Sequence, residues 1–229
     1  MQRSPARAAR FAAVAACVAA VAMAAPAVAS AIDTTLRVEG ISDTILAQSG
    51  VQIDGTGTAT VYDSTGAAVT IGKGNAFWQL VRASSGRFGL RFTYFSAWGS
   101  FFVNRIGPDE PGAADYWQYR VNHTDPGIGA DQVDLADGDS GVWFTGNGMG
   151  THTLDAAPSS DRLAKGASFT VKVTAYTAAG AASPAAGASV TFGPLRATTD
   201  ERGEVTFIAP GNGVQVGILH HRHHFGPYK

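Results

Sequence analysis

The chain has 229 residues, of which 45% are hydrophobic and 15% are charged, with a formal charge of −1. This composition excludes an intrinsically disordered chain, and the length allows one large domain or two small ones. The 28 glycines indicate many turns.

The N-terminus has the pattern of a secretory signal peptide. Three arginines precede an apolar run over residues 11–25, which the small-residue sequence AVASA follows. A basic start, an apolar centre and an A-x-A site mark such a signal, and the run is too short and too rich in Ala for a stable membrane span. We predict a signal peptide at 1–31, cleaved after Ala31 or, alternatively, after Ala29. We expect a secreted protein, extracellular or at the cell surface, without membrane insertion after cleavage.

Loss of the signal changes the charge and the thiol content of the mature chain. Of the 17 Lys and Arg, three leave with it, and the remaining 14 face 18 Asp and Glu, a formal charge of −4. This balance gives no electrostatic footprint for nucleic acid, so we expect no nucleic-acid partner. Cys17 also lies in the signal; VAAC would suit lipoprotein processing, but the apolar run continues past it. We therefore expect a mature chain without disulfides or cysteine metal ligands.

Short strands punctuated by turn residues follow the signal. Period-two alternation and aromatic or β-branched residues predict the strands, and Gly, Asp, Ser and Pro separate them. Residues 107–115, GPDEPGAAD, are predicted to form a loop. In chain order, the predicted strands of the first half cover residues 34–41, 44–55, 58–66, 87–95, 101–107, 116–122 and 137–144.

One helix interrupts these strands, at residues 74–86. Asn75 is a suitable N-cap, and Phe77, Leu80 and Val81 fall at the i, i+3, i+4 spacing of one helix face. Gly86 supplies a stop signal.

Aromatic residues divide the mature chain into two modules. All four tryptophans lie between residues 78 and 143, which indicates an aromatic-rich domain at 32–147. Residues 148–160, rich in Gly, Ala, Pro and Ser, are predicted to be a linker. Residues 161–229 are predicted to form short alternating strands without Trp, spaced as in a small β-sandwich. The predicted fold class is mostly β, with one helix in the first domain.

The first domain resembles a known family. The segments LRVEG, TILAQSGV, YWQYRVN and DGDSGVWF, in this order around one helix, resemble the domain-of-unknown-function family 4430, which is related to the C-terminal β-domain of transcobalamin and intrinsic factor. The resemblance covers residues 35–146. It implies a β-grasp-like α+β fold, in which a mixed sheet wraps one helix, and a corrinoid-like ligand. The chain departs from the family at Asn122, which His123 follows where Asn-Gly is common.

The second domain resembles carboxypeptidase-regulatory-like and bacterial Ig-like modules. Their pattern is P-x-x-G-A-x-V followed by T-D-x-x-G and an alternating strand. The resemblance implies a small Ig-like β-sandwich that serves as a spacer or adhesive unit and carries no catalytic residues. The matching residues are Pro184, Gly187, Ala188, Val190, Thr199, Asp200 and Gly203.

Two groups of residues have the chemistry of metal ligands. Asp131, Asp134, Asp137 and Asp139 offer the oxygens that calcium prefers, but they lack the terminal Glu of an EF-hand loop, and Asp-Gly between strands is a hairpin signal. We favour a turn over a calcium site. In a strand, His221 and His223 would share a face and could take Zn or Cu through their imidazoles; a disordered tail is the favoured alternative.

Aromatic residues of the 116–122 strand are the candidate ligand surface. Trp117 and Tyr119 share one strand face, whereas Tyr116, Gln118 and Arg120 share the other. For a ligand-binding protein we expect a concave aromatic and polar surface that also includes Asn122, Asp139 and Trp143. A core position for these aromatics is the favoured alternative, because a small domain without disulfides needs large side chains inside.

Two function classes follow from these patterns. The first is a secreted, non-catalytic binding module for a small ligand, with a corrinoid as the suggestion of the resemblance. The second is an extracellular or cell-surface structural or adhesion protein that binds macromolecular partners. We expect no enzyme and no cofactor, because the chain has no G-x-S-x-G elbow and no cysteine nucleophile in its mature part.

Overall fold

The computed structural model describes residues 31–112, 114–148, 150–160, 162–210 and 214–215. In this part the protein is mostly β, with several small sheets, one α-helix and one 3-10 turn, η1 (Ala130–Gln132). Residues 1–30 of the predicted signal peptide lie outside the described residues, as does the His-rich tail. Neither of the helices in the described ranges is long and apolar enough to cross a membrane.

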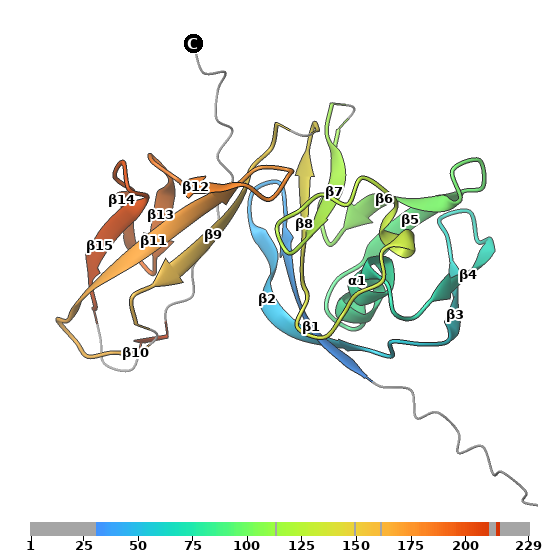
Figure 1. The fold of residues 1–229 in the computed structure, drawn as a ribbon, viewed down its shortest axis with the longest axis horizontal. Helices are drawn as coiled ribbons and strands as arrows, with labels where there is room; N and C mark the ends of the chain where they lie inside the picture. The colour runs from blue at the N-terminus through green and yellow to red at the C-terminus, as the bar shows by residue number, and fades with distance from the viewer. Residues whose placement is uncertain (1–30, 113, 149, 161, 211–213, 216–229) are drawn as a thin grey trace, which may run out of the picture.

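A four-stranded mixed sheet forms the centre of the first module (Figure 1). Its order is β2-β1-β8-β7; β1 pairs with β8 in parallel, and the two outer pairs are antiparallel. The parallel pair joins the first and last strands of the module, so closure of the sheet needs contacts between distant parts of the sequence. These strands are β1 (Ile32–Glu39), β2 (Thr44–Ile53), β7 (Tyr116–Val121) and β8 (Ser140–Gly146).

The predicted helix is confirmed as α1 (Ala76–Ser84), which packs on one face of this sheet. The Asn75 side-chain oxygen accepts the backbone N–H of Trp78 at 2.8 Å and so caps the first turn. Phe77 and Leu80 are fully buried against the sheet. Gln79 is also fully buried, and its amide donates to the Thr34 hydroxyl at 2.7 Å, which ties the helix to β1.

Two hairpins complete the core of the first module. Phe92 and Phe101 come from the second hairpin and surround Phe77, with ring centroids at 5.0 and 4.3 Å from it. The fourth strand, β4, was not among the predicted strands. The hairpins are β3 (Thr58–Tyr62) with β4 (Ala68–Gly72), and β5 (Leu90–Phe95) with β6 (Ser100–Ile106).

The second module has a separate core of Phe169, Phe192, Phe207 and smaller apolar side chains. Its main sheet centres on β11, which pairs with β12, β15 and β9. The linker predicted at 148–160 is therefore not a free connection, because β9 lies within it. The strands are β9 (Thr153–Pro158), β10 (Arg162–Leu163), β11 (Ser168–Tyr176), β12 (Ala182–Pro184), β13 (Ser189–Phe192), β14 (Leu195–Thr198), β15 (Glu204–Ile208) and β16 (Val214–Gln215).

The sequence pattern of the second module has a structural explanation. The Thr199 hydroxyl donates to the Ala185 carbonyl at 2.5 Å and accepts the Ala188 N–H at 2.8 Å. Gly203 has a φ of 74°, and a Cβ there would collide with the carbonyl oxygen of Val173. Both motif positions thus hold a turn against the sheet, and Gly203 is required by backbone conformation as well as by space.

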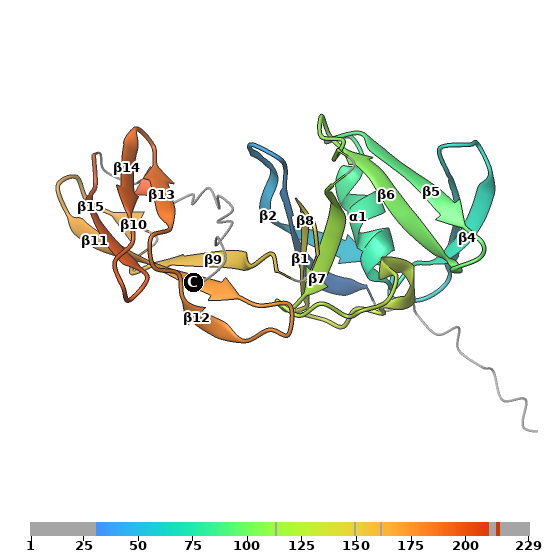
Figure 2. The ribbon, with the colours of Figure 1, turned by 90° about the horizontal axis from the view of Figure 1, so that it is seen from above.

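The two modules meet on the face of the central sheet opposite α1, as Figure 2 shows from above. Arg120, on β7, is 1% exposed and donates from Nη1 to the Tyr176 carbonyl at 2.9 Å and from Nη2 to the Thr151 carbonyl at 2.5 Å. Arg37, on β1, donates to the Leu154 carbonyl at 2.7 Å. Two buried arginines therefore join the modules through main-chain acceptors.

Candidate functional site

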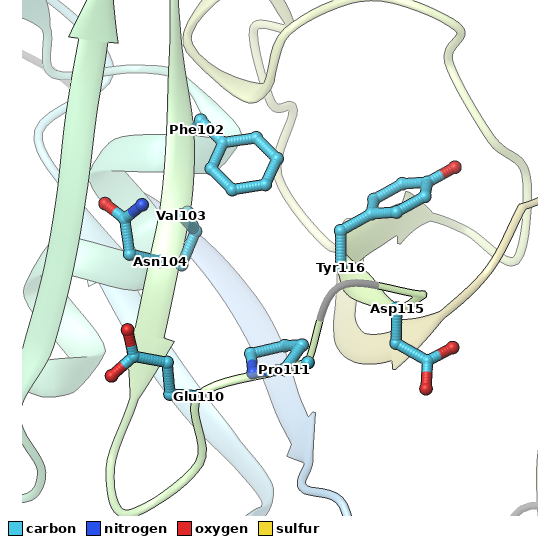
Figure 3. Close-up of a pocket in the computed structure, with 8 residues that line it drawn as sticks. Phe102, Val103, Asn104, Glu110, Pro111, Asp115 and Tyr116 are labelled. Carbon is cyan, nitrogen blue, oxygen red and sulfur yellow. The ribbon is translucent and has the colours of Figure 1, made fainter.

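A cavity of about 350 Å³ lies between β6 and β7 (Figure 3). β6 is half of a two-stranded sheet and β7 is the outer strand of the central sheet, so each strand has an unpaired edge. The loop between them, residues 107–115, borders the cavity and was predicted as a loop. The lining residues are Phe102, Val103, Asn104, Glu110, Pro111, Gly112, Asp115 and Tyr116.

Two exposed aromatic rings form walls of the cavity. Phe102 on β6 is 39% exposed and Tyr116 at the start of β7 is 41% exposed. Val103, which follows Phe102 on β6 and also lines the cavity, is instead buried in the core. Strand alternation explains this difference, because successive side chains point to opposite faces. The rings therefore present apolar surface to solvent at the cavity.

The polar part of the lining is held by neighbouring side chains. Glu110 forms an ion pair with Arg91 of β5, and the Asn104 side-chain oxygen accepts the Thr93 hydroxyl at 3.0 Å. In Figure 3 the Glu110 side chain lies on the β6 side of Pro111, and Asp115 lies on the other side of that proline. The polar groups thus lie at the border of the cavity and the aromatic rings lie beside them.

A separate set of contacts anchors the 107–115 loop. Ile106 and Asp109 exchange two backbone hydrogen bonds, at 3.0 and 3.1 Å, and Gly107 between them has a φ of 56°. The Asp109 carboxylate accepts the Ile41 N–H at 2.6 Å, which ties the loop to the β1–β2 turn. A Cβ at Gly40 would collide with this carboxylate. The loop is therefore positioned by residues that do not line the cavity themselves.

The predicted aromatic ligand residues lie in the core instead. Trp117 and Trp143 are 5% and 4% exposed, and the Tyr119 ring stacks on Trp143 with centroids 5.2 Å apart. The Tyr119 hydroxyl donates to the Ile128 carbonyl at 2.8 Å; burial raises the pKa of this phenol, and Asp125 and Asp131 raise it further. Their burial does not fit a ligand surface and agrees with the alternative of a core role.

Asn122 and Asp139, also predicted as ligand residues, form a clip between β7 and β8. The Asn122 amide donates to the Asp139 carboxylate at 2.7 Å, and its oxygen accepts the Ser140 N–H at 2.9 Å. Asn122 and His123 have positive φ values of 49° and 65°, a conformation that Asn tolerates better than most residues. The structure brings these two predicted residues together, in a role that shapes the turn.

The aspartates of the 122–140 excursion have separate partners. Asp131 accepts the Ser100 hydroxyl at 2.5 Å, Asp137 accepts the Asp33 N–H at 3.0 Å, and Asp139 also accepts the Ala136 N–H at 2.7 Å. Within the described ranges, no group of three or more His, Cys, Asp or Glu has the arrangement of a metal site. His221 and His223, the other predicted ligands, lie outside the described residues.

A smaller polar cavity, about 180 Å³, lies at the junction of the modules and is lined in part by Arg37, His123 and Asp155. Burial lowers the pKa of Arg37, and Glu39 and Asp155 oppose this shift. The His123 ring stacks on Tyr176 at 3.7 Å; burial lowers its pKa, Asp155 opposes this effect, and the nearby arginines reinforce it. The guanidinium of Arg37 is already engaged by Glu39 at 3.1 Å and by the second module, so we assign this cavity a structural role.

The sequence predicted the strands and the loop that border the larger cavity, but it did not predict the cavity itself. Tyr116 was placed on the strand face opposite Trp117, and 107–115 was predicted as a loop. The proximity of β6 to β7 has no signal in the sequence, because it depends on how the β5–β6 hairpin packs on α1. No family model matches the chain, and no curated protein matches it at a significant level.

Proposed function

We propose that the chain is a secreted, non-catalytic binding module whose small ligand enters the cavity between β6 and β7. The cavity itself carries this proposal: its volume of about 350 Å³ lies within the range of roughly 300–1,000 Å³ typical of small-molecule sites. It also combines the two kinds of lining that such sites use, apolar rings and a few polar groups.

We further propose a β-grasp fold for the first module and an Ig-like sandwich for the second. The order β2-β1-β8-β7, the parallel β1–β8 pair and α1 on one face support the first assignment. The hairpin of β13 and β14, whose side chains share a core with β11 and β15, supports the second. The resemblance to the domain-of-unknown-function family 4430 is in keeping with this proposal.

The ligand that we propose is smaller than a corrinoid. A corrinoid macrocycle with its side chains exceeds what a cavity of about 350 Å³ encloses. The buried positions of Trp117 and Trp143 also remove the surface on which the larger ligand was expected to lie.

A fragment screen by two-dimensional NMR, on residues 32–229, tests the proposal. Bound fragments are expected to shift the backbone signals of Phe102, Asn104 and Tyr116. Phe102→Ala is expected to weaken their binding, because it removes one wall of the cavity. Phe95→Ala is the matched control, since Phe95 has the same 39% exposure but does not line the cavity. Equal effects of the two substitutions, or shifts confined to other regions, would contradict the proposal.

A macromolecular partner is the second candidate, and exposed aromatics outside the cavity favour it. Trp98 in the β5–β6 turn is 70% exposed and Tyr62 at the end of β3 is 69% exposed. Large aromatic side chains at the surface are enriched at protein interfaces. Fragment screens without any binding at the cavity, together with loss of partner capture in Trp98→Ala, would favour this candidate over the first.

A further inference from the structure

The charges at the cavity between β6 and β7 are of one sign. Among its eight described lining residues, Glu110 and Asp115 are the two charged side chains, and both are acidic. Arg91 pairs with Glu110 and offsets one of these charges, which leaves the cavity with a net negative character. An anionic ligand would be repelled by the remaining charge.

The aromatic rings of the cavity also favour a cationic ligand. Phe102 and Tyr116 have 39% and 41% of their surfaces exposed, so their rings are accessible at the cavity. The face of an aromatic ring carries a negative partial charge and attracts a cation within about 6 Å of its centroid. Quaternary ammonium groups are bound in this way by aromatic side chains.

We infer that the ligand of this cavity is a small organic cation with a methylated or primary ammonium head, which contacts the exposed Phe102 and Tyr116 rings and is attracted by the Glu110 and Asp115 carboxylates at the border of the cavity. This inference rests on the proposed function and names the ligand class of the same site. A neutral ligand such as a sugar could use the rings and the Asn104 amide, but it would gain nothing from the net charge. The charge is therefore the property that separates the two classes.

Choline is a suitable probe because an uncharged molecule of the same shape exists, 3,3-dimethyl-1-butanol. Both are titrated into residues 32–229 by two-dimensional NMR, with N-acetylglucosamine as the neutral sugar. We expect choline to shift the signals of Phe102 and Tyr116, and to bind about 2- to 5-fold more tightly than the alcohol, in line with a cation–π contribution of roughly 0.5–1 kcal/mol at an exposed site. Its affinity is expected to fall when salt rises from about 0.01 to 1 M, which shortens the screening length from about 30 to 3 Å.

Variants separate charge from shape. Asp115→Asn is expected to weaken choline binding by about 1.4- to 5-fold, because an exposed ion pair contributes about 0.2–1 kcal/mol. Glu110→Gln is expected to have an effect of the same size, because it leaves the positive charge of Arg91 unbalanced beside the cavity. Neither substitution is expected to affect the alcohol. Glu201→Gln is the control, since Glu201 is an exposed acid in a turn of the second module. Phe102→Leu keeps an apolar side chain and is expected to weaken choline more than the alcohol.

The outcomes of these titrations distinguish the inferred class of ligand, an organic cation, from the proposed small-ligand function on which it rests. Equal binding of choline and the alcohol, or equal effects of Glu110→Gln and Glu201→Gln, would overturn the inference. Binding of the sugar at the cavity without binding of choline would also overturn it, while the proposed small-ligand function would stand. If none of the three probes and no fragment shifts the cavity signals, both fail.

Discussion

Arg120→Met is expected to uncouple the two modules and to destabilise the protein by about 3 kcal/mol. The guanidinium of Arg120 donates to two carbonyls and to the Thr153 hydroxyl, at distances of 2.5, 2.9 and 3.1 Å, and lies over the Phe144 ring at 5.2 Å. Methionine keeps most of the apolar volume but makes none of these hydrogen bonds.

The magnitude follows from the acceptors that remain. Each of the two carbonyls left without a partner costs about 1–3 kcal/mol. Loss of the contact with Phe144 adds about 1 kcal/mol. Removal of a buried cation offsets part of the loss, because its desolvation penalty disappears as well. The net expectation of about 3 kcal/mol corresponds to a shift of roughly 1–3 M in the urea midpoint.

Two optical signals make the assay specific for the junction. All four tryptophans belong to the first module, so their fluorescence reports its unfolding alone, whereas circular dichroism reports both modules. In the parent protein we expect the two urea transitions to coincide; in Arg120→Met we expect them to separate. Arg105→Met, which removes an exposed arginine from β6, is the control. Coincident transitions in Arg120→Met, with a midpoint equal to that of the control, would refute the coupling role.

Three other changes test separate parts of the fold. Asn75→Ala is expected to destabilise the first module by about 1–2 kcal/mol, measured by urea unfolding, because it removes the helix cap and the bond from its amide to the Asp131 carbonyl at 3.0 Å. In the Arg120→Met background, where the modules are expected to unfold separately, Gly203→Ala is expected to lower the melting temperature of the second module, seen by circular dichroism but not by tryptophan fluorescence, since the alanine Cβ meets the Val173 carbonyl. The Thr65 hydroxyl, aided by the backbone N–H groups of Thr65, Ala67 and Tyr94, lowers the pKa of Asp63 to about 2. Its folded pKa is below the unfolded value, so its stabilisation is present above about pH 4 and is lost as pH falls towards 2; Asp63→Asn should make stability less dependent on pH in that window. An unchanged pH profile in Asp63→Asn would contradict this reasoning.

Local signals in the sequence predicted the elements whose formation is local. The helix depends on Asn75 and on the spacing of Phe77 and Leu80, all within one segment, and it forms where expected. Strand alternation correctly predicted that Trp117 lies on one face of β7 and that Tyr116 and Arg120 lie on the other. The sequence could not say which face meets the core and which meets the second module.

Features that depend on distant pairing escaped prediction. β9 lies in a segment whose Gly, Ala, Pro and Ser content is typical of a linker, yet its backbone groups pair with β11. For Trp117 and Trp143 the sequence favoured a core position over a ligand surface without showing what would cover them; the parallel pairing of β1 with β8 and the packing of α1 bury both of them. The cavity between β6 and β7 depends on two sheets meeting, and no short segment encodes that meeting.

At the junction, Arg120 and Arg37 donate mainly to main-chain oxygens, which affects how the second module can change over evolutionary time. Every residue type supplies the same carbonyl, so the hydrogen bonds from Arg120 and Arg37 to main-chain oxygens tolerate exchange of the side chains at the acceptor positions, although exchange of Tyr176 would remove its ring contact with His123. A different second module with the same backbone path would keep these hydrogen bonds, and the first module would need to change only where side chains meet, as at His123 and Tyr176.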